Sequence, residues 1–382
     1  MGSVSADVGY NYLLDTALEY GINYSDWSNF GINWSSEEGQ SFNIHHNVID
    51  KVGYLAISTG GRGNIEKNFI RNATYLYNDG GAIAFDHVQP APGGLTVKQN
   101  IILDCPGNLF GTGPDYHHYE LMCSGIAFGD QKNSNTRVTE NTVANATRAA
   151  VSIDESLMYL NGTSGAYGPN RGHEVDHNTF MGTNIGVTQG DWSTYRFHQV
   201  ENTGLNCPSR ENSPACFVSA YNNRVHDNLI YKTKSTDIYH YYLHVWSNGT
   251  GAKSSFYGTL GGVAGYSDNN TYVNPFGLTN GSWGRIHCDG GPDCGNNYIS
   301  FSQWKTQWEH QDSHSIEKTG SGIAGLASPE ERGIIYYNNT DQTRTIPTQK
   351  SCMYTLDGAA AGASITLPAF GSQILEQGTC SH

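Results

Sequence analysis

The chain has 382 residues, 21 basic and 35 acidic side chains, and a net charge of −14. An acidic balance of this kind excludes the usual nucleic-acid-binding protein and the protein that docks on an anionic membrane surface. The sequence contains no run of about 18 apolar residues, so we expect no membrane-spanning helix. The length exceeds that of a small domain, but a single solenoid can use all of it.

One short phrase recurs along the chain. Residues 1–29 show no clear copy, and we expect them to form a cap or a lead-in. From about Phe30 onward, an apolar residue, two variable positions, an asparagine, one variable position and a second apolar residue repeat. The copies centre on Asn47, Asn68, Asn100, Asn141, Asn178 and Asn228, with a weaker copy at Asn270. The closest pair, Asn47 and Asn68, is 21 residues apart, which fits one coil of a solenoid with loops added elsewhere.

Apolar residues alternate with polar ones around each of these asparagines, as expected for strands and not for helices. The asparagine fits a bend at which its amide hydrogen-bonds the equivalent bend of the next coil. We therefore expect the six asparagines to form one stacked, inward-facing ladder. The pattern predicts an all-β fold, a right-handed parallel β-helix over residues 30–299.

A second strand in each coil carries acids at its end. We align these strands on their apolar residues Ile32, Ile57, Ile83, Ile126, Val151 and Val187. The acids that then fall in one column are Asp86, Asp130, Asp154, Glu155 and Asp191. Coils repeat at roughly 4.8 Å, which places Asp86 roughly 5 Å from Asp130 and roughly 9–10 Å from Asp154. The shorter distance suits a retaining glycosidase and the longer one an inverting glycosidase. The alternative is that these acids are ordinary turn residues.

Other candidate residues accompany this column. Asp79 is either a turn residue or a third acid, and His87 would orient a carboxylate or a sugar hydroxyl. Sugar rings stack on aromatic side chains. We therefore predict a substrate-binding set of Trp34, Tyr116, His117, Tyr119, Asp191 and Trp192. Adjacent histidines at 117 and 118 are only a weak indication of a metal site, so none is predicted.

Eight cysteines can form four pairs that are close in sequence. The pairs are Cys105 with Cys123, Cys207 with Cys216, Cys288 with Cys294, and Cys352 with Cys380. The connectivity is left open, since eight cysteines allow 105 arrangements, but we expect disulfides between Cys207 and Cys216 and between Cys288 and Cys294. Zinc would need tight Cys-x-x-Cys spacing, which is absent, and free thiols are the remaining alternative. No leader peptide is visible, and we expect a secreted or periplasmic protein from which the leader has been removed.

Residues 300–382 differ in character from the coils. Phe301–Trp304 predicts a short helix, and residues 332–378 alternate like small antiparallel strands. We expect a β cap that closes the C-terminal end of the helix, because an open coil exposes unpaired strand edges.

With its Ile-x-x-Asn-x-Ile coils and the strand Asn78-Asp-Gly-Gly-Ala-Ile83, the chain resembles the pectate-lyase-like superfamily over about residues 30–275. The same strand is similar to segments of β-helix glycoside hydrolases that act on xylosides, fucosides and related glycans. The resemblance implies a carbohydrate-active enzyme, although lyases, epimerases and phage spikes share the scaffold. The Asp-Pro-His-Asp motif of mannuronan epimerases is absent, and Phe85-Asp-His87 matches it only in part.

We therefore predict a glycoside hydrolase that cleaves a polysaccharide or oligosaccharide. Asp86, Asp130 and Asp154 would be the core carboxylates, supported by Glu155 and His87. Hydrolysis of this kind requires no cofactor.

Two alternatives stay open. A polysaccharide lyase would use a His or Tyr base and an Arg or Ca²⁺ to neutralise a uronate, and Arg62 and Arg148 are the nearest arginines to the column. A non-enzymatic β-helix would bind glycan or serve as a structural spike. The oligomeric state is left open.

Overall fold

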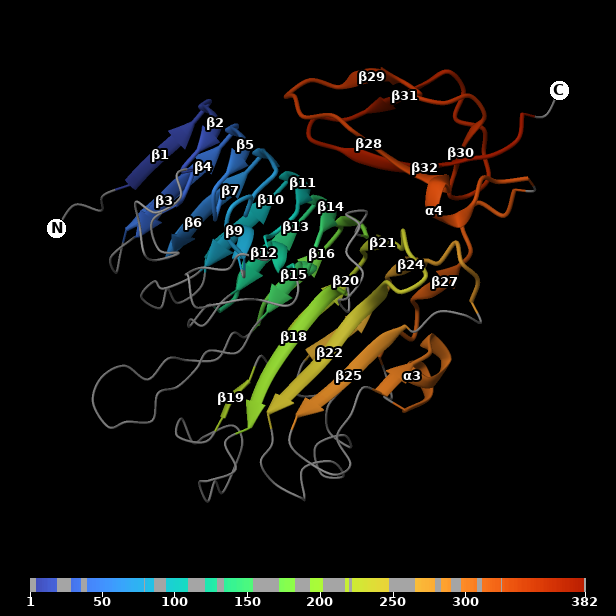
Figure 1. Cartoon of the computed structure of the whole chain (residues 1–382), viewed down its shortest axis with the longest axis horizontal. Coiled ribbons are helices and arrows are strands. Elements are labelled where there is room, and N and C mark those ends of the chain that lie inside the picture. Colours follow the sequence, from blue (N-terminus) through green and yellow to red (C-terminus); the bar gives the residue numbers. More distant parts are fainter. Residues whose placement is uncertain are drawn as a thin grey trace.

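The computed structural model describes residues 5–18, 29–35, 40–78, 80–85, 94–108, 121–128, 134–153, 172–182, 193–201, 217–219, 222–246, 265–278, 283–289, 297–307, 311–323 and 325–380. Three sheets, which we name A, B and C, run side by side along one solenoid (Figure 1). Each coil contributes one strand to each sheet in turn. Within these residues, no helix is long and apolar enough to cross a membrane.

Sheets A and B contain only parallel pairs in the described part of the chain. Sheet A has the order β1 (Ser5–Gly9), β4 (Ser41–His45), β7 (Arg62–Glu66), β10 (Leu95–Lys98), β13 (Arg137–Thr139), β16 (Glu174–Asp176), β20 (Asn223–His226) and β23 (Gly265–Asp268). Sheet B has the order β2 (Tyr12–Thr16), β5 (Val48–Val52), β8 (Phe69–Arg71), β11 (Ile101–Cys105), β14 (Thr142–Ala146), β17 (Thr179–Met181), β21 (Leu229–Tyr231), β24 (Thr271–Val273) and β27 (Ile316–Lys318).

Sheet C contains the longest strands. Its order is β3 (Ile32–Ser35), β6 (Ile57–Gly60), β9 (Gly80–Phe85), β12 (Cys123–Phe128), β15 (Ala149–Ile153), β18 (Ser193–Glu201), β22 (Ile238–Trp246), β25 (Gly284–Asp289) and β26 (Asn297–Ile299). β19 (Phe217–Ser219) pairs with β18, and both β19 and β26 run antiparallel to their neighbours. The predicted right-handed parallel β-helix is confirmed.

The asparagine ladder is also confirmed. The side-chain amide of Asn47 donates to Oδ1 of Asn68 at 2.9 Å, and the backbone N–H of Asn47 donates to the same oxygen at 3.0 Å. The same pair of bonds repeats from coil to coil until Asn270, whose backbone N–H donates to Oγ of Ser315 at 2.7 Å. These contacts satisfy buried polar groups at every bend, so the ladder fixes the stacking of the coils.

The residue before each predicted ladder asparagine adopts the left-handed backbone region. Its φ lies between 55° and 57° at all six positions, which are His46, Lys67, Gln99, Glu140, His177 and Asp227. A positive φ in a residue other than glycine is uncommon, and here it turns the chain sharply between a strand of sheet A and the next strand of sheet B. The repeated phrase is therefore a backbone bend as well as a hydrogen-bonding position.

The solenoid includes residues that we expected to form a lead-in. β1 pairs in parallel with β4, and β2 pairs in parallel with β5. Asn11 joins the ladder, since its side-chain amide donates to Oδ1 of Asn47 at 2.8 Å. Val8-Gly-Tyr-Asn11-Tyr-Leu13 is in fact a copy of the repeated phrase. At the other end, β24 pairs with β27, so parallel coiling continues beyond residue 299.

Aromatic side chains close the C-terminal end of the core. Trp283 stacks on Trp304 of α3 (Phe301–Gln307) with ring centroids 4.5 Å apart, and both rings are fully buried. The indole of Trp304 donates to the buried carboxylate of Asp312 at 2.8 Å, and Tyr272 donates to the other oxygen at 3.0 Å. The helix α3, predicted from residues 301–304, therefore covers the last coil.

The small antiparallel unit at the C-terminus exists, but its predicted position was wrong. It consists of α4 (Pro329–Arg332), a sheet of β28 (Gly333–Tyr337), β32 (Ser372–Gln377) and β30 (Met353–Thr355), and a pair of β29 (Arg344–Pro347) with β31 (Ser364–Leu367). Instead of closing the end, it lies along the flank of sheet B (Figure 1, orange to red). Phe370 and Ile374 pack there against Phe69, Leu103 and Met181. Those outward apolar residues of sheet B explain the position, because burying them removes apolar surface from water.

Candidate functional site

Sheet C aligns the strands that precede the predicted acids. Ile83 of β9 pairs with Ile126 of β12, and Ile126 pairs with Val151 of β15. The strand ends are aligned as well, because Phe128 pairs with both Phe85 and Ile153. The alignment on which the acidic column was predicted is confirmed for these three strands.

The acids themselves follow these strand ends in sequence and lie outside the described residues. The same holds for most of the predicted set: Asp79, Asp86, His87, Tyr116, His117, Tyr119, Asp130, Asp154, Glu155, Asp191 and Trp192. Their roles therefore stay predictions.

Trp34 is the predicted site residue that the structure describes. It lies in β3, and its partner in the neighbouring strand is Thr59. Its side chain is partly buried and packs against the hydrophobic core of the helix, as does Ile32 two residues earlier. Trp34 thus contributes to core packing, a role that the sequence interpretation did not give it.

The predicted alignment of Val187 was wrong. The neighbour of β15 in sheet C is β18, in which Tyr195 pairs with Val151 and Phe197 pairs with Ile153. The register position that the sequence alignment gave to Val187 is therefore held by Tyr195. Asp191 precedes this strand in sequence instead of following it.

The outer face of sheet C is built from small residues over several coils. Ser58 pairs with Ala84 across β6 and β9, and Ala127 pairs with Ser152 across β12 and β15. Ala84 also pairs with Ala127, so these positions form one continuous row. Ser58, Ala84 and Ser152 are nevertheless buried, and Ala84 packs in a cluster with Tyr54 and Tyr77, so this row is not open to solvent.

The same row continues into larger residues on the last coils. Arg196 of β18 pairs with Ser152, Tyr241 of β22 pairs with Arg196, and Arg285 of β25 pairs with Tyr241. His198, His244 and His287 share another register position on the same three strands. Of the two arginines considered for a lyase, Arg62 lies at the start of β7 in sheet A, away from this face.

The sequence interpretation missed these two rows, although a signal was present. Arg196-Phe-His198 and Arg285-Ile-His287 share the pattern Arg, apolar, His. Tyr241-Tyr-Leu-His244 has one residue more, and strand pairing shows an irregularity at this point of β22. The extra residue hides the similarity in the sequence.

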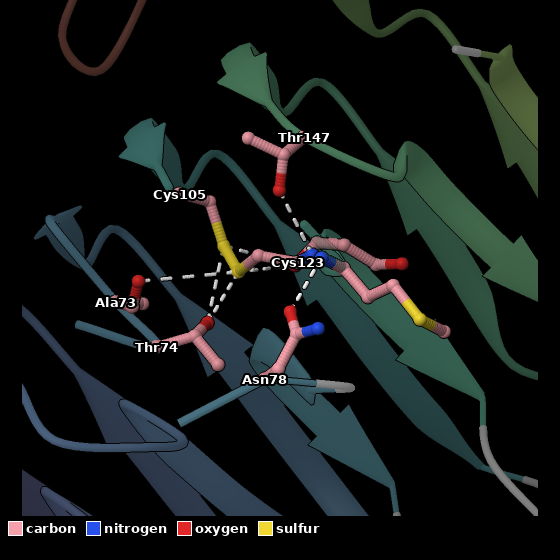
Figure 2. Close-up of a disulfide and its surroundings, with 8 residues drawn as sticks. Ala73, Thr74, Asn78, Cys105, Cys123 and Thr147 are labelled. Atoms are coloured by element: carbon pink, nitrogen blue, oxygen red, sulfur yellow. Dashed lines mark hydrogen bonds between the residues drawn. A yellow bond between two sulfur atoms is a disulfide. The ribbon is translucent and has the colours of Figure 1, made fainter. Parts of the chain in front are cut away.

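A disulfide holds the other ends of the acid-bearing strands (Figure 2). Cys105 at the end of β11 is bonded to Cys123 at the start of β12, which is one of the four pairs that are close in sequence. The backbone N–H of Cys123 donates to Oγ1 of Thr147 at 3.0 Å, and that of Met122 donates to Oδ1 of Asn78 at 2.5 Å. These contacts tie together the turns that lead into β9, β12 and β15, and so fix their register.

The remaining cysteines divide into two groups. Cys352 is bonded to Cys380, another of the pairs that are close in sequence. The predicted pairs of Cys207 with Cys216 and of Cys288 with Cys294 depend on positions outside the described side chains.

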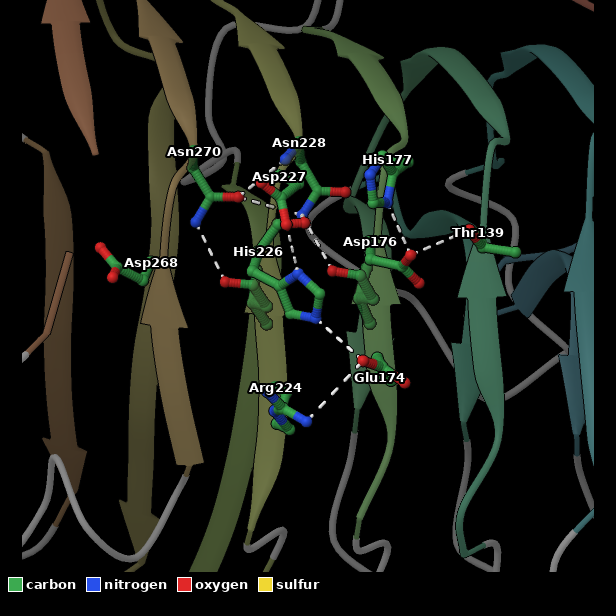
Figure 3. Close-up of polar contacts among 12 residues, drawn as sticks. Thr139, Glu174, Asp176, His177, Arg224, His226, Asp227, Asn228, Asp268 and Asn270 are labelled. Atoms are coloured by element: carbon green, nitrogen blue, oxygen red, sulfur yellow. Dashed lines mark hydrogen bonds and ion pairs between the residues drawn. The ribbon is translucent and has the colours of Figure 1, made fainter. Parts of the chain in front are cut away.

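Sheet A has a different outer face, on which charges pair between neighbouring coils (Figure 3). Arg137 Nη2 and Nε lie 2.7 and 3.1 Å from the two carboxylate oxygens of Asp176, and Nδ1 of His177 lies 2.7 Å from one of them. Glu174 lies 3.0 Å from Nε2 of His226. Burial alone would raise the pKa of Asp176, but the hydrogen bonds from Arg137 and His177 hold it below its usual value.

Asp268 continues this paired surface at the next coil. Its carboxylate lies 2.6 Å from Nδ1 of His314 and accepts a hydrogen bond from the Tyr266 hydroxyl at 2.7 Å. Burial opposes ionisation, yet the bonds from His314 and Tyr266 prevail and lower the pKa of Asp268 to about 2. Among the side chains that the structure places, no group of three or more His, Cys, Asp or Glu residues could hold a metal ion.

No protein-family model and no curated protein sequence matches the chain. Among solved structures, it is similar to a double mutant of the tailspike protein of E. coli bacteriophage HK620 in complex with a pentasaccharide. That match has a TM-score of 0.39 and 8% identity, and it covers 98% of this chain and 68% of the tailspike chain. A single mutant of the same tailspike, also with a pentasaccharide, matches with a TM-score of 0.20, 10% identity, and coverage of 98% and 84%. Similarities this distant establish no activity, and the fold rests on the strand pairing itself.

Proposed function

We propose that the chain is a glycoside hydrolase whose carboxylates act at the ends of β9, β12 and β15 on sheet C. The observation that carries the proposal is the pairing of Phe128 with both Phe85 and Ile153. Because of this register, the strands that precede the predicted acids end side by side, although the acids come from three separate parts of the sequence. Two carboxylates on either side of a sugar bond are the groups that glycoside hydrolysis requires.

The register favours one pair among the predicted acids. Asp86 follows Phe85 by one residue and Asp154 follows Ile153 by one residue, whereas Asp130 follows Phe128 by two. Asp86 and Asp154 therefore follow equivalent register positions, Phe85 and Ile153, which are two strands apart, a separation of roughly 9–10 Å. This distance leaves room for a water molecule between a general acid and a general base, so we propose inversion at the anomeric carbon.

The arrangement of the strands that precede these acids supports an extended substrate. β9, β12 and β15 are neighbours in sheet C, so a glycan chain at their ends would extend across several coils. We propose a polysaccharide or oligosaccharide as the partner. The disulfides fit a protein exported to an oxidising compartment, and we propose a secreted or periplasmic location.

A second candidate is a polysaccharide lyase, and the row of Arg196, Tyr241 and Arg285 favours it. An arginine can neutralise the carboxylate of a uronate, and tyrosine can act as a base. The row begins on β18, next to β15, and extends over β22 and β25, away from the three strands that precede the acids. Hydrolysis remains the first proposal because its two acids share one register position.

Product chemistry separates the two reactions. The full chain would be incubated with soluble polysaccharides that are neutral, sulfated or rich in uronate. Hydrolysis releases reducing ends without a new double bond, and NMR of the first product reports its anomeric form. A lyase instead gives an unsaturated sugar that absorbs in the ultraviolet, and this result would replace the first proposal with the second.

Variants then assign the acids. Asp86→Asn and Asp154→Asn should each lower kcat by about 10²–10⁴-fold, because each removes one acid–base group. Asp357→Asn is the matched control, since that side chain is 90% exposed on the C-terminal unit. Glycan binding that persists in a chain without any turnover would favour the non-enzymatic alternative.

A further inference from the structure

Two adjacent histidines join the first coils to the C-terminal unit. His45 is the last residue of β4, and His46 occupies the bend that follows it. Their Nδ1 atoms lie 2.7 Å apart, which is a hydrogen-bond distance. Nε2 of His45 lies 2.8 Å from Oδ1 of Asp7 in β1. Nε2 of His46 lies 2.7 Å from Oδ1 of Asp341 in the C-terminal unit, so the four side chains form a series of three hydrogen bonds.

Packing fixes the two imidazole rings in these positions. Gly9 lies opposite His45 in register, and the imidazole fills the space that a side chain at residue 9 would need. The ring of Tyr10 stacks on His46 with centroids 4.8 Å apart, and Phe370 contacts the same imidazole at 5.6 Å. The two histidine side chains are consequently only 14% and 12% exposed.

The loop that carries Asp341 is held in place as well. The side-chain amide of buried Asn338 donates to the carbonyl oxygen of Gln342 at 2.7 Å. The hydroxyl of Thr340 donates to Oδ1 of Asn338 at 2.7 Å. Asp341 therefore meets the histidine pair from a closed loop.

The three hydrogen bonds fix the number of protons on the pair. An ionised carboxylate only accepts hydrogen bonds, so both Nε2 atoms must carry a proton. The contact between the Nδ1 atoms needs one more proton, because two bare nitrogens or two N–H groups would repel each other. The pair therefore holds three protons on four ring nitrogens and carries one positive charge between two carboxylates. Loss of one proton breaks one of the bonds, and a fourth proton sets two N–H groups against each other.

Other titratable groups face the pair from neighbouring elements. Glu66 of β7 pairs with His45 in register. Lys67 occupies the equivalent bend on the next coil, and Tyr10 lies against both imidazole rings. Glutamate, lysine and tyrosine ordinarily titrate outside the range of about pH 5–8, in which histidine changes its charge. A change of pH within this range is therefore expected to act on the histidines.

We propose that His45 and His46 form a pH-sensitive latch between the solenoid and the C-terminal unit. The latch is closed when the two Nδ1 atoms share one proton, and it opens when that proton is lost or a fourth is added. Opening separates the loop at residues 338–342 from the first coils.

The opening should be local, because β32 attaches the C-terminal unit to later coils. There Ser372 lies 2.6 Å from Oγ1 of Thr142, and Glu376 accepts a hydrogen bond from the Tyr231 hydroxyl at 3.0 Å. Neither contact involves a histidine. β32 should therefore stay protected while the loop opens.

Hydrogen exchange of the wild-type chain, followed by mass spectrometry across and beyond about pH 5–8, tests the latch. After correction for the intrinsic exchange rate, peptides from residues 338–342 should show a maximum of protection. The protection should fall about 10-fold on either side of it, as expected for one lost hydrogen bond to a charged group. Peptides from β32 are the internal control and should show no maximum. Loop protection that does not change with pH would overturn the proposal.

Variants assign the effect to the pair. His46→Gln should lower loop protection about 10-fold at the maximum, because it removes the link to Asp341. His45→Gln should abolish the maximum and keep the protection, since a neutral His46 can still donate to Asp341. Gln99 already occupies an equivalent bend with φ 56°, so the backbone accepts glutamine there. His177→Gln is the matched control, because that bend residue bonds an aspartate of sheet A and should leave loop protection unchanged.

NMR of the wild-type chain with isotope-labelled histidine covers variants that fail to fold. At the pH of maximal protection, one pair of ring nitrogens should show a scalar coupling across an N–H···N hydrogen bond. The coupling should disappear at higher and at lower pH, together with the loop protection. Histidine rings without any such coupling at every pH would overturn the proposal. Neither measurement depends on whether the chain hydrolyses a glycan.

Discussion

The outer faces of sheets A and C use the same coil spacing in opposite ways. On sheet A, Glu174 lies between Arg137 and Arg224, and a second row places Asp176 beside His226 and then Asp268. On sheet C, the row of Ala84, Ala127 and Ser152 carries no charge.

The difference concerns what stacked charges do in a solenoid. Charges that alternate in sign neutralise each other across about 4.8 Å and stabilise the stack. A row of small uncharged residues contributes no such pairing, and the predicted acids follow the strands of this sheet in sequence. Sheet A is therefore the stabilising face, and sheet C is the face to which we assign function.

Loss of the Cys105–Cys123 disulfide should have the largest effect on stability. The bond closes a loop with a sequence separation of 18 residues, and such a crosslink contributes about 3 kcal/mol. Cys105→Ser combined with Cys123→Ser should lower the free energy of unfolding by that amount in guanidinium titrations. Because the bond fixes the register of β12, turnover should fall as well. A double variant with unchanged stability would show that the hydrogen bonds of Asn78 and Thr147 suffice.

Asp176→Ala should have the next largest effect, and it acts on the stabilising face. The carboxylate is fully buried and receives bonds from Arg137, His177 and Thr139. Removing it should cost about 2–3 kcal/mol, the range for hydrogen bonds to a charged group. The measurement is again chemical unfolding, with Asp357→Asn as the exposed control. If the two variants were equally stable, Asp176 would not stabilise sheet A, and the proposed difference between the faces of sheets A and C would be lost.

Acid titration should reveal a smaller contribution from Asp268. Its pKa is lowered to about 2, below the ordinary value of 3.8, so its ionised form is favoured in the folded state. This stabilisation is fully present above about pH 4 and is lost as the pH falls toward 2. Asp268→Asn should flatten the stability profile in that window and cost about 1–2 kcal/mol at neutral pH. An unchanged profile would show that the pair with His314 contributes nothing.

The sequence predicted the coils well because each bend depends on local chemistry. The asparagine and the apolar residues around it can be recognised in the sequence at every copy, and even the overlooked copy at Asn11 has the full phrase. The alignment failed at Val187 because Tyr195 takes the register position where earlier strands have Ile or Val. A search for apolar residues could not tell the two segments apart.

Tertiary contacts explain the other differences. The C-terminal unit lies on sheet B because Phe69, Leu103 and Met181 present an apolar flank, and only the assembled coils bring those residues together. The rows of Arg196 and Arg285 and of the histidines likewise exist only after β18, β22 and β25 are paired. Trp34 was assigned to substrate from its residue type, whereas its place in β3 puts it against the core.

A crossed comparison of Asp154→Asn and Asp176→Asn tests the central claim most directly. Both turnover of the cleaved glycan and the free energy of unfolding would be measured for each variant. We predict that Asp154→Asn lowers kcat by about 10²–10⁴-fold with little change in stability. We predict that Asp176→Asn lowers stability and leaves kcat within about twofold where the protein is folded. Normal turnover in Asp154→Asn together with lost turnover in folded Asp176→Asn would contradict the assignment of function to sheet C.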